Sequence, residues 1–352
     1  MKKRTKKTLI IVLSFLILIG ILLLGFNFYI DSLLNKAQIE EPITEDIKEE
    51  EINVVEPIDT SHKVVNFMLV GADNLDTSNG RENSYIEERS DVLKIVSLDY
   101  TNKTIKLTSL DRDVVVYLPI EEQYGHFNWA YSYGGATSAL STINYNLDLD
   151  VSKYVTFSFA GFINVIDRIG GIDVELTQAE ADQINSGWSK TTEVYEGMNH
   201  LDGYNALSYA RIRYIDSDFV RMDRQNTVIK AVITKLKEYS LLELVSLVSD
   251  CMPYITTNLT IDEIKDYLTD AITFDLKNIK TQAYPTGEAN DVCWNTSNLG
   301  GYLLRSYSDQ VIKLHQYIYE VEDYKPTQNI YENENRTYEL YGEFYSNSEL
   351  LP

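Results

Sequence analysis

The feature that most constrains this chain is its N-terminus, where a basic segment precedes a long uncharged apolar run. The run extends from Leu9 to Ile30 and would reach roughly 33 Å as a helix, enough to span a hydrocarbon core of about 30 Å. A cleaved signal peptide is the alternative, but its apolar region would be shorter and would end in a small-residue cleavage site. Because basic residues stay cytoplasmic, the sequence predicts a cytoplasmic tail at 1–8, a transmembrane anchor at 9–30 and an extracytoplasmic remainder.

The composition of the remainder limits its partners. The chain has a formal net charge of -22, which argues against nucleic acid as a partner because a phosphate backbone demands a basic surface. Residues 31–62 are acidic and contain Pro42 and Pro57, so they predict an extended linker with no core of its own. Cys251 and Cys293 have no metal-ligand or redox spacing, and whether they form a disulfide stays open.

From Val64 onward, short apolar runs alternate with amphipathic stretches. Strands are predicted at 64–71, 91–99, 104–111, 153–159, 172–176 and 279–285, and helices at 134–150, 160–171, 218–248, 260–272 and 306–320. This alternation indicates a sheet covered by helices on both faces, an α/β/α layered fold. We expect one folded domain at 63–324 and a mobile acidic tail at 325–352.

One short segment of this acidic chain is rich in arginine. Residues 208–225 contain Arg211, Arg213, Arg221 and Arg224. Like charges about 8 Å apart repel by roughly 2 kcal/mol at an effective dielectric near 20. We expect Asp218 to be a helix N-cap, which would place Arg221, Arg224 and Gln225 on one face near a helix N-terminus that favours anions. The segment predicts an anion site, and a solvated arginine face is the alternative.

Two carboxylates flank neighbouring predicted strands. Asp73 follows the first strand and Asp91 precedes the second, so they could meet at one sheet edge and hold a hard divalent ion. Arg89 and Arg112 would add positive charge near that edge. An aspartate in a turn after a strand is common, so spacing alone leaves the metal site open.

Seven stretches that follow one another between Val64 and Tyr239 together resemble the LytR–CpsA–Psr (LCP) family of bacterial cell-wall assembly. They are "LVGAD", "ERSD", "TSLDRDVVVYLP", "FNWAYSYGGA", "FAGFINVIDRIGGIDVEL", "GMNHLDGYNALSYARIR" and "DFVRMDRQ". The resemblance implies an LCP-type fold with a central mixed sheet. It also implies a phosphotransferase that moves a glycopolymer, such as teichoic acid or capsular polysaccharide, from an undecaprenyl-pyrophosphate carrier to a peptidoglycan hydroxyl. That hydroxyl is typically C6 of N-acetylmuramic acid, and undecaprenyl phosphate is released.

The resemblance also implies roles for particular residues. Asp73 and Asp91 would hold Mg²⁺, or Mn²⁺ in its place, and would act in catalysis together with Arg112. The implied pyrophosphate-binding set is Arg89, Arg112, Arg211, Arg213, Arg221, Arg224 and Gln225. The chain departs from the family pattern at "NLD" after Asp73, where members often have Arg, and at Asp111 and His126, where many have Pro and Lys.

The polyprenyl chain of such a substrate would need an apolar channel between helix and sheet. Candidate residues are Phe157, Phe159, Phe162, Val165, Val228, Ile229 and Val232, although the sequence favours plain core for each of them. Two other functions stay open: a polyprenyl-pyrophosphate hydrolase that uses water as acceptor, and a non-catalytic membrane-anchored attenuator or sensor of the lipid carrier. The sequence does not identify the glycopolymer.

Overall fold

The computed structural model describes residues 47, 51–55, 63–72, 90–187, 191–213, 215–271, 273–276, 278–286, 292–294 and 299–347. The predicted cytoplasmic tail, the anchor and most of the acidic linker lie outside this part of the chain. Among the described residues, no helix combines the length and apolar character needed to span a membrane.

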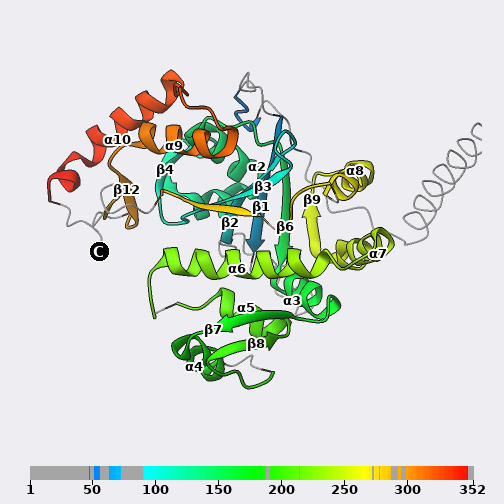
Figure 1. The fold of residues 1–352 in the computed structure, drawn as a ribbon. Helices are drawn as coiled ribbons and strands as arrows, with labels where there is room; N and C mark the ends of the chain where they lie inside the picture. Colours follow the sequence, from blue (N-terminus) through cyan, green and yellow to red (C-terminus); the bar gives the residue numbers. More distant parts are fainter. Residues whose placement is uncertain are drawn as a thin grey trace, which may run out of the picture.

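A six-stranded mixed sheet forms the centre of the molecule, in the order β10-β3-β2-β1-β6-β9 (Figure 1). Its strands are β1 (Val64–Ala72), β2 (Ser90–Asp99), β3 (Thr104–Leu110), β6 (Lys153–Ser158), β9 (Ile255–Thr257) and β10 (Lys280–Tyr284). β2 is antiparallel to both β1 and β3, whereas β6 is parallel to β1 and β10 is parallel to β3. Consequently β1, β3, β6 and β10 end at one edge of the sheet, and β2 begins there.

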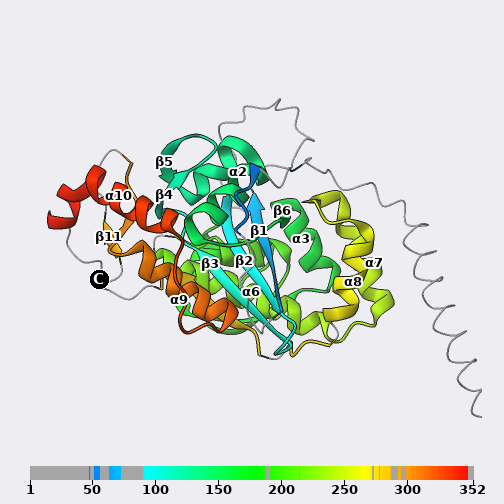
Figure 2. The ribbon, with the colours of Figure 1, turned by 90° about the horizontal axis from the view of Figure 1, so that it is seen from above.

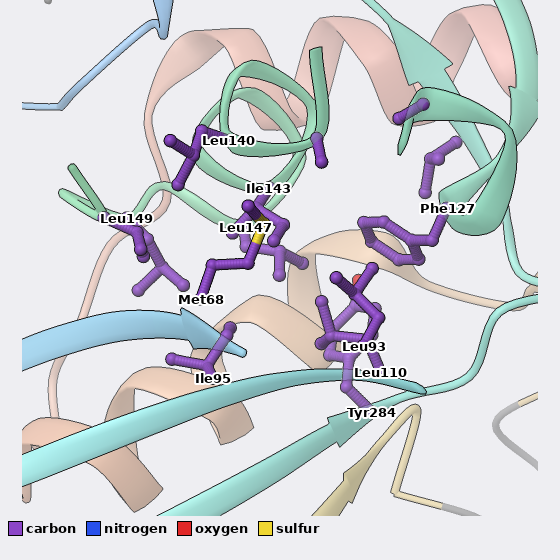
Figure 3. Close-up of a cluster of buried hydrophobic side chains, with 14 of the residues drawn as sticks. Met68, Leu93, Ile95, Leu110, Phe127, Leu140, Ile143, Leu147, Leu149 and Tyr284 are labelled. Atoms are coloured by element: carbon purple, nitrogen blue, oxygen red, sulfur yellow. The ribbon is translucent and has the colours of Figure 1, made fainter. Parts of the chain in front are cut away.

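Helices α2 (Phe127–Leu147) and α9 (Tyr307–Tyr319) cover one face of this sheet. Apolar side chains of the strands, such as Met68 and Ile95, pack with Ile143 and Leu147 of α2 in the main hydrophobic cluster (Figure 3). The opposite face is covered by α3 (Phe159–Arg168), α5 (Gly203–Ala210) and α6 (Asp218–Leu236), which lie below the sheet in Figure 1. Helices on both faces confirm the predicted α/β/α layers.

The remaining elements lie around this centre. They are β4 (Val115–Leu118), β5 (Gln123–His126), β7 (Ile172–Leu176), α4 (Gln178–Ser186), β8 (Gly197–Leu201), α7 (Leu241–Cys251), the short 3₁₀ turn η3 (Met252–Tyr254), α8 (Ile261–Ala271), β11 (Val292–Trp294), β12 (Tyr302–Leu304) and α10 (Gln328–Asn347). Viewed from above, α7 and α8 lie at one end of the sheet and α9 and α10 at the other (Figure 2). Cys251 and Cys293 are both buried free thiols.

Several predicted elements differ in detail. The run at 172–176 is a strand, but β7 pairs with β8 in a separate two-stranded antiparallel sheet and not with the central sheet, and α4 lies between the two strands in the sequence. The amphipathic stretch 218–248 is two helices, because Ser240 and Glu243 form a capping box that begins α7. Gly134 and Gly135 interrupt α2, with φ of 60° at Gly135, so these glycines break a helix that the sequence expected them to open.

Two segments that the sequence placed outside any core are packed against it. Ile52, within the predicted linker, is 1% exposed in the main cluster, and its carbonyl oxygen accepts a hydrogen bond from Asn144 Nδ2 at 2.8 Å. The tail predicted to be mobile forms α10, where Ile330 is 1% exposed and Asn333 Nδ2 donates to Asn146 Oδ1 at 2.9 Å. Polar side chains dominate α10, but long-range contacts order it.

Two buried lysines differ in their partners. Lys106 Nζ lies 3.3 Å from Asp99 Oδ2 and 3.0 Å from Glu320 Oε1. Lys94 Nζ instead donates to the neutral Ser109 Oγ at 2.6 Å and Asn226 Oδ1 at 2.9 Å. Burial lowers the pKa of the Lys94 ammonium to about 7, a shift that Asp223 opposes and Arg221 reinforces.

Replacing Lys94 with methionine should stabilise the fold at neutral and lower pH. The pKa of lysine is near 10.5 in the unfolded state and near 7 for Lys94 in the folded state. Between pH 7 and pH 10.5 the unfolded state therefore binds more protons than the folded state. The stability of the wild type consequently rises with pH across this range. At pH 6 the Lys94 ammonium is charged in both states, so the folded state bears the whole free-energy penalty of burying it. Removing this charge should add roughly 2–5 kcal/mol to the free energy of unfolding. Urea unfolding at pH 6, 8 and 10 should show the gain shrinking as pH rises.

Lys106→Met is the matched control for this prediction. It leaves the fully buried Asp99 carboxylate without its ammonium partner, and should cost roughly 3 kcal/mol. Equal losses of stability in the two variants would contradict the assignment of Lys94 as a buried charge whose hydrogen-bond partners among the described residues are neutral.

Candidate functional site

An apolar cavity of about 210 Å³ lies between the central sheet and helices α3, α5 and α6. Strand residues such as Leu69 and Val92 form one wall. All seven residues considered for an apolar channel line it: Phe157, Phe159, Phe162, Val165, Val228, Ile229 and Val232. A cavity of this lining suits the apolar chain of a ligand.

Cationic and polar side chains form part of the same cavity wall. They are Arg211, Arg213, Arg221 and Gln225. The Arg211 guanidinium lies over the Phe159 ring, 4.3 Å from its centroid, so a cation–π contact fixes one of these charges beside the apolar lining. The cavity therefore offers apolar surface and guanidinium donors to one ligand, which fits an anionic group attached to an apolar chain.

A carboxylate cluster lies beside these arginines. The turn after β3 carries Asp111, Arg112 and Asp113, and α6 contributes Asp218. One carboxylate oxygen of each of the three aspartates lies within 4.8 Å of the others. Arg112 Nε is 3.4 Å from Asp113 Oδ2 and 3.5 Å from Asp218 Oδ2, whereas Arg221 Nη2 is 2.7 Å from Asp218 Oδ2. Two guanidinium groups from different elements therefore converge on Asp218.

Asp111 is the most buried member of this cluster, at 1% exposure. Its Oδ1 accepts the Asp113 backbone N–H at 3.0 Å, and its Oδ2 has no hydrogen-bond partner in the described part of the chain. Burial raises the pKa of the Asp111 carboxyl to about 7; the Asp113 N–H opposes this rise, and the Asp218 and Asp113 carboxylates add to it.

The three aspartates could hold a metal ion. Their donors are all oxygens, which suits a hard divalent cation, and the buried Asp111 Oδ2 is available as a ligand. Sequence patterns missed this cluster because Asp218 reaches Asp111 and Asp113 only through the tertiary fold. Of the predicted metal pair, Asp73 and the side chain of Asp91 lie outside the described residues. The backbone register does pair Ala72, the last residue of β1, with Ser90, the first of β2.

Helix α6 distributes its site residues differently from the prediction. Ser217 is the N-cap and Asp218 is the first helical residue, so the prediction of Asp218 as N-cap is wrong. Arg221 and Gln225 line the cavity, but Arg224 does not. Arg224 is 2% exposed and its guanidinium donates to both oxygens of Asp216, at 2.6 and 2.7 Å, and to Glu180 Oε1 at 3.3 Å. Arg224 thus ties α6 to α4 and to the loop before α6.

Arg224→Met should lower the free energy of unfolding by roughly 3 kcal/mol, because it leaves the carboxylates of Asp216 and Glu180 without their shared cation. Arg221→Met is the control, since it should weaken binding of inorganic pyrophosphate with a smaller loss of stability. Urea unfolding and calorimetry on both variants measure the two effects. Weakened pyrophosphate binding in Arg224→Lys at unchanged stability would instead place Arg224 among the ligand-binding residues.

A segment far along the chain also lies beside the cluster. The backbone N–H of Tyr302 donates to Asp113 O at 2.8 Å, and His126 Nε2 lies 3.1 Å from Gly300 O. Gly301 has φ of 80°, and a Cβ there would collide with the Asp113 carbonyl oxygen, so the close approach requires glycine. His126 is 7% exposed and packs on Trp129, and sequence patterns gave no signal for residues 300–302. Arg89, the remaining predicted phosphate ligand, lies outside the described residues.

Together the fold and the site define a class of protein: an α/β/α domain that offers one ligand both an apolar cavity and a set of arginines beside a carboxylate cluster. Residues 26–309 match the model of the LytR_cpsA_psr family. The chain belongs to the LytR–CpsA–Psr family.

Curated relatives and solved structures agree with this assignment. The polyisoprenyl-teichoic acid–peptidoglycan teichoic acid transferase TagV of Bacillus subtilis is 32% identical over 213 residues, covering 59% of this chain and 53% of TagV. The chain thus spans about half the length of TagV. The transferase TagU of Bacillus cereus is 29% identical over 262 residues, covering 71% of this chain and 79% of TagU. The structure of the family protein YwtF (TagT) with bound octaprenyl pyrophosphate lipid has a TM-score of 0.57 at 21% identity, covering 80% of this chain and 97% of that chain, and shares the fold.

Proposed function

We propose that this protein transfers a glycopolymer from a polyprenyl-pyrophosphate carrier, undecaprenyl pyrophosphate in bacterial cell-wall assembly, to a hydroxyl of peptidoglycan, the C6 hydroxyl of N-acetylmuramic acid. The acceptor oxygen attacks the phosphorus that bears the glycan and loses its proton. The bond from that phosphorus to the bridging oxygen breaks, so that polyprenyl phosphate leaves and a phosphodiester joins glycan to wall. The glycopolymer is a teichoic acid or a capsular or secondary wall polysaccharide.

The cavity that combines apolar lining with arginines is the observation that carries this proposal. A polyprenyl pyrophosphate has this combination of a long apolar chain and a dianionic or trianionic head. The YwtF (TagT) structure contains an octaprenyl pyrophosphate lipid in a protein of the same fold, and TagV and TagU are teichoic acid transferases.

The proposed roles of the residues follow from charge and position. Arg211, Arg213 and Arg221 on the cavity wall bind the pyrophosphate, with Gln225 as a neutral donor, and Arg89 is assigned to the same set. Arg112 faces the charge that builds on the leaving phosphate. Arg224 supports α6 through its ion pairs and does not belong on the cavity wall in this assignment.

Mg²⁺ is the proposed metal, and Asp73 and Asp91 are its proposed ligands. When bound, the ion would neutralise phosphate charge during transfer. The carboxylate cluster of Asp111, Asp113 and Asp218 offers a further set of oxygen donors close to Arg112.

We further propose that residues 9–30 anchor the protein in the cell membrane with the domain outside. Protease added to intact protoplasts should then remove the folded domain and leave a membrane-bound fragment, because the basic residues before Thr8 hold the N-terminus in the cytoplasm. Protection of the domain until the membrane is permeabilised would contradict this topology.

The function itself is tested with the full chain in detergent, a synthetic polyprenyl-pyrophosphate glycan, a peptidoglycan acceptor and Mg²⁺. Mass analysis should find glycan joined to the acceptor through a phosphodiester, with polyprenyl phosphate released in equal amount. Free glycan phosphate would indicate a hydrolase, and tight binding without products would indicate a sensor of the carrier.

A further inference from the structure

Arg112 and Arg221 approach each other from different parts of the chain. Arg112 comes from the turn after β3 and Arg221 from the first turn of α6. Both lie close to a single atom, Asp218 Oδ2, at 3.5 Å and 2.7 Å. Two guanidinium groups brought this close repel each other, and the Asp218 carboxylate near both offsets that repulsion.

Asp218 is not used as an ordinary helix cap. The N-cap is Ser217, whose side chain makes no capping hydrogen bond in the described structure, and Asp218 follows it as the first helical residue. Its carboxylate is favoured there by the helix dipole, but its close contacts are with the two arginines. Arg221 is 4% exposed, so the contact lies within the protein and is weakly screened by solvent.

The neighbouring acids of the cluster have contacts of their own. Asp113 Oδ2 lies 3.4 Å from Arg112 Nε and offers that arginine a second carboxylate. Asp111 belongs to the same cluster, but its Oδ1 accepts the Asp113 N–H and its Oδ2 has no hydrogen-bond partner among the described residues. The Asp218 carboxylate contacts both guanidinium groups, through the same oxygen, Oδ2.

We propose that Asp218 is a positioning residue, whose carboxylate holds Arg112 and Arg221 at the spacing that the pyrophosphate of the substrate requires. The inference rests on the proposed function for the substrate and adds a role for a residue outside the assigned set. Asp218 acts through the arginines and contacts no reacting atom. Its negative charge also reduces the attraction of the site for anions, so its loss should lower turnover without lowering the affinity for pyrophosphate.

Asp218→Asn in the full chain tests this role, because it keeps the side-chain shape and removes the charge. We expect kcat for glycan transfer to fall roughly 10–100-fold, since loosely held arginines stabilise the transition state less well. We expect affinity for inorganic pyrophosphate, measured by calorimetry, to stay equal or to rise up to about 10-fold, because one repulsive charge is gone. Asp218→Glu, which restores the charge, should recover part of kcat.

Asp223→Asn is the matched control, because it removes the same charge from an exposed position on the same helix. It should leave both quantities near wild type. The inference is overturned if Asp218→Asn lowers kcat, pyrophosphate affinity and melting temperature together, as a purely structural residue would, or if kcat is unchanged. Mn²⁺ binding is also measured in the absence of pyrophosphate. If the wild type binds Mn²⁺ and Asp218→Asn does not, Asp218 is a metal ligand and the inference is overturned. A wild-type protein that neither binds pyrophosphate nor transfers glycan would refute the proposed function.

Discussion

Arg112→Ala should lower kcat for glycan transfer by roughly 10²–10³ while changing KM little, the scale for removing one main electrostatic stabiliser of a transition state. Arg112 follows β3 at the sheet edge where β1 ends and β2 begins, which is the edge next to the proposed metal ligands Asp73 and Asp91 in the sequence. Negative charge moves onto the leaving phosphate only as the bond breaks, and a cation at that place acts mainly on turnover.

Arg221→Ala is the comparison variant, because its main effect is expected on KM and not on kcat. Arg221 lines the cavity and lies in the first turn of α6, where it would meet the pyrophosphate already present in the bound substrate. Losing a charge-assisted contact of about 1.5–3 kcal/mol should raise KM roughly 10–150-fold with a smaller effect on kcat. Steady-state kinetics on both variants measure the split. If both variants only raise KM, the assignment of Arg112 to the transition state is wrong, although both arginines would still bind the anionic substrate.

Val232→Trp should reduce kcat/KM for a long-chain polyprenyl substrate by roughly 10²-fold. Val232 lines the cavity of about 210 Å³, and the indole would occupy space that the apolar chain needs. Displacing three or four methylene groups at about 0.8 kcal/mol each accounts for an effect of this size. Affinity for inorganic pyrophosphate should not change, because the arginines are untouched.

Val220→Trp is the control for that substitution. Val220 lies on the same helix but is 40% exposed and outside the cavity wall, so the added ring should not alter dependence on chain length. The measurement is kcat/KM for a series of prenyl chain lengths with each variant. An unchanged preference for long chains in Val232→Trp would show that the lipid binds elsewhere.

Local patterns predicted most of the central sheet because its strands are short apolar runs bounded by turns. The run at 172–176 shows the limit of such patterns. It is a strand, as predicted, but the residues of Ile172–Leu176 do not indicate whether it pairs with β8 or with the central sheet. Residues 328–347 show the converse. Their polar composition resembles a mobile tail, whereas contacts with distant residues, such as Tyr124 and Asn146 with Asn333, hold α10 in place.

The candidate site follows the same division. Helical spacing correctly brought Arg221 and Gln225 to one cavity wall, because both lie on one face of α6. The same spacing predicted that Arg224 would lie with them, and that prediction is wrong. Helical spacing contains no information about Asp216 and Glu180, whose ion pairs with Arg224 hold its side chain away from the cavity. The cluster of Asp111, Asp113 and Asp218 needed the packing of α6 against the sheet edge, and no run of adjacent residues encodes it.

The most direct test of the proposed transfer is to run the reaction of the full chain with lipid-linked glycan and peptidoglycan in H₂¹⁸O and to weigh the products. Transfer uses the oxygen of the acceptor hydroxyl, so the wall-linked phosphodiester and the released polyprenyl phosphate should both contain no ¹⁸O. Glycan phosphate carrying one ¹⁸O atom, with no glycan joined to the wall, would contradict transfer, because water would then be the acceptor.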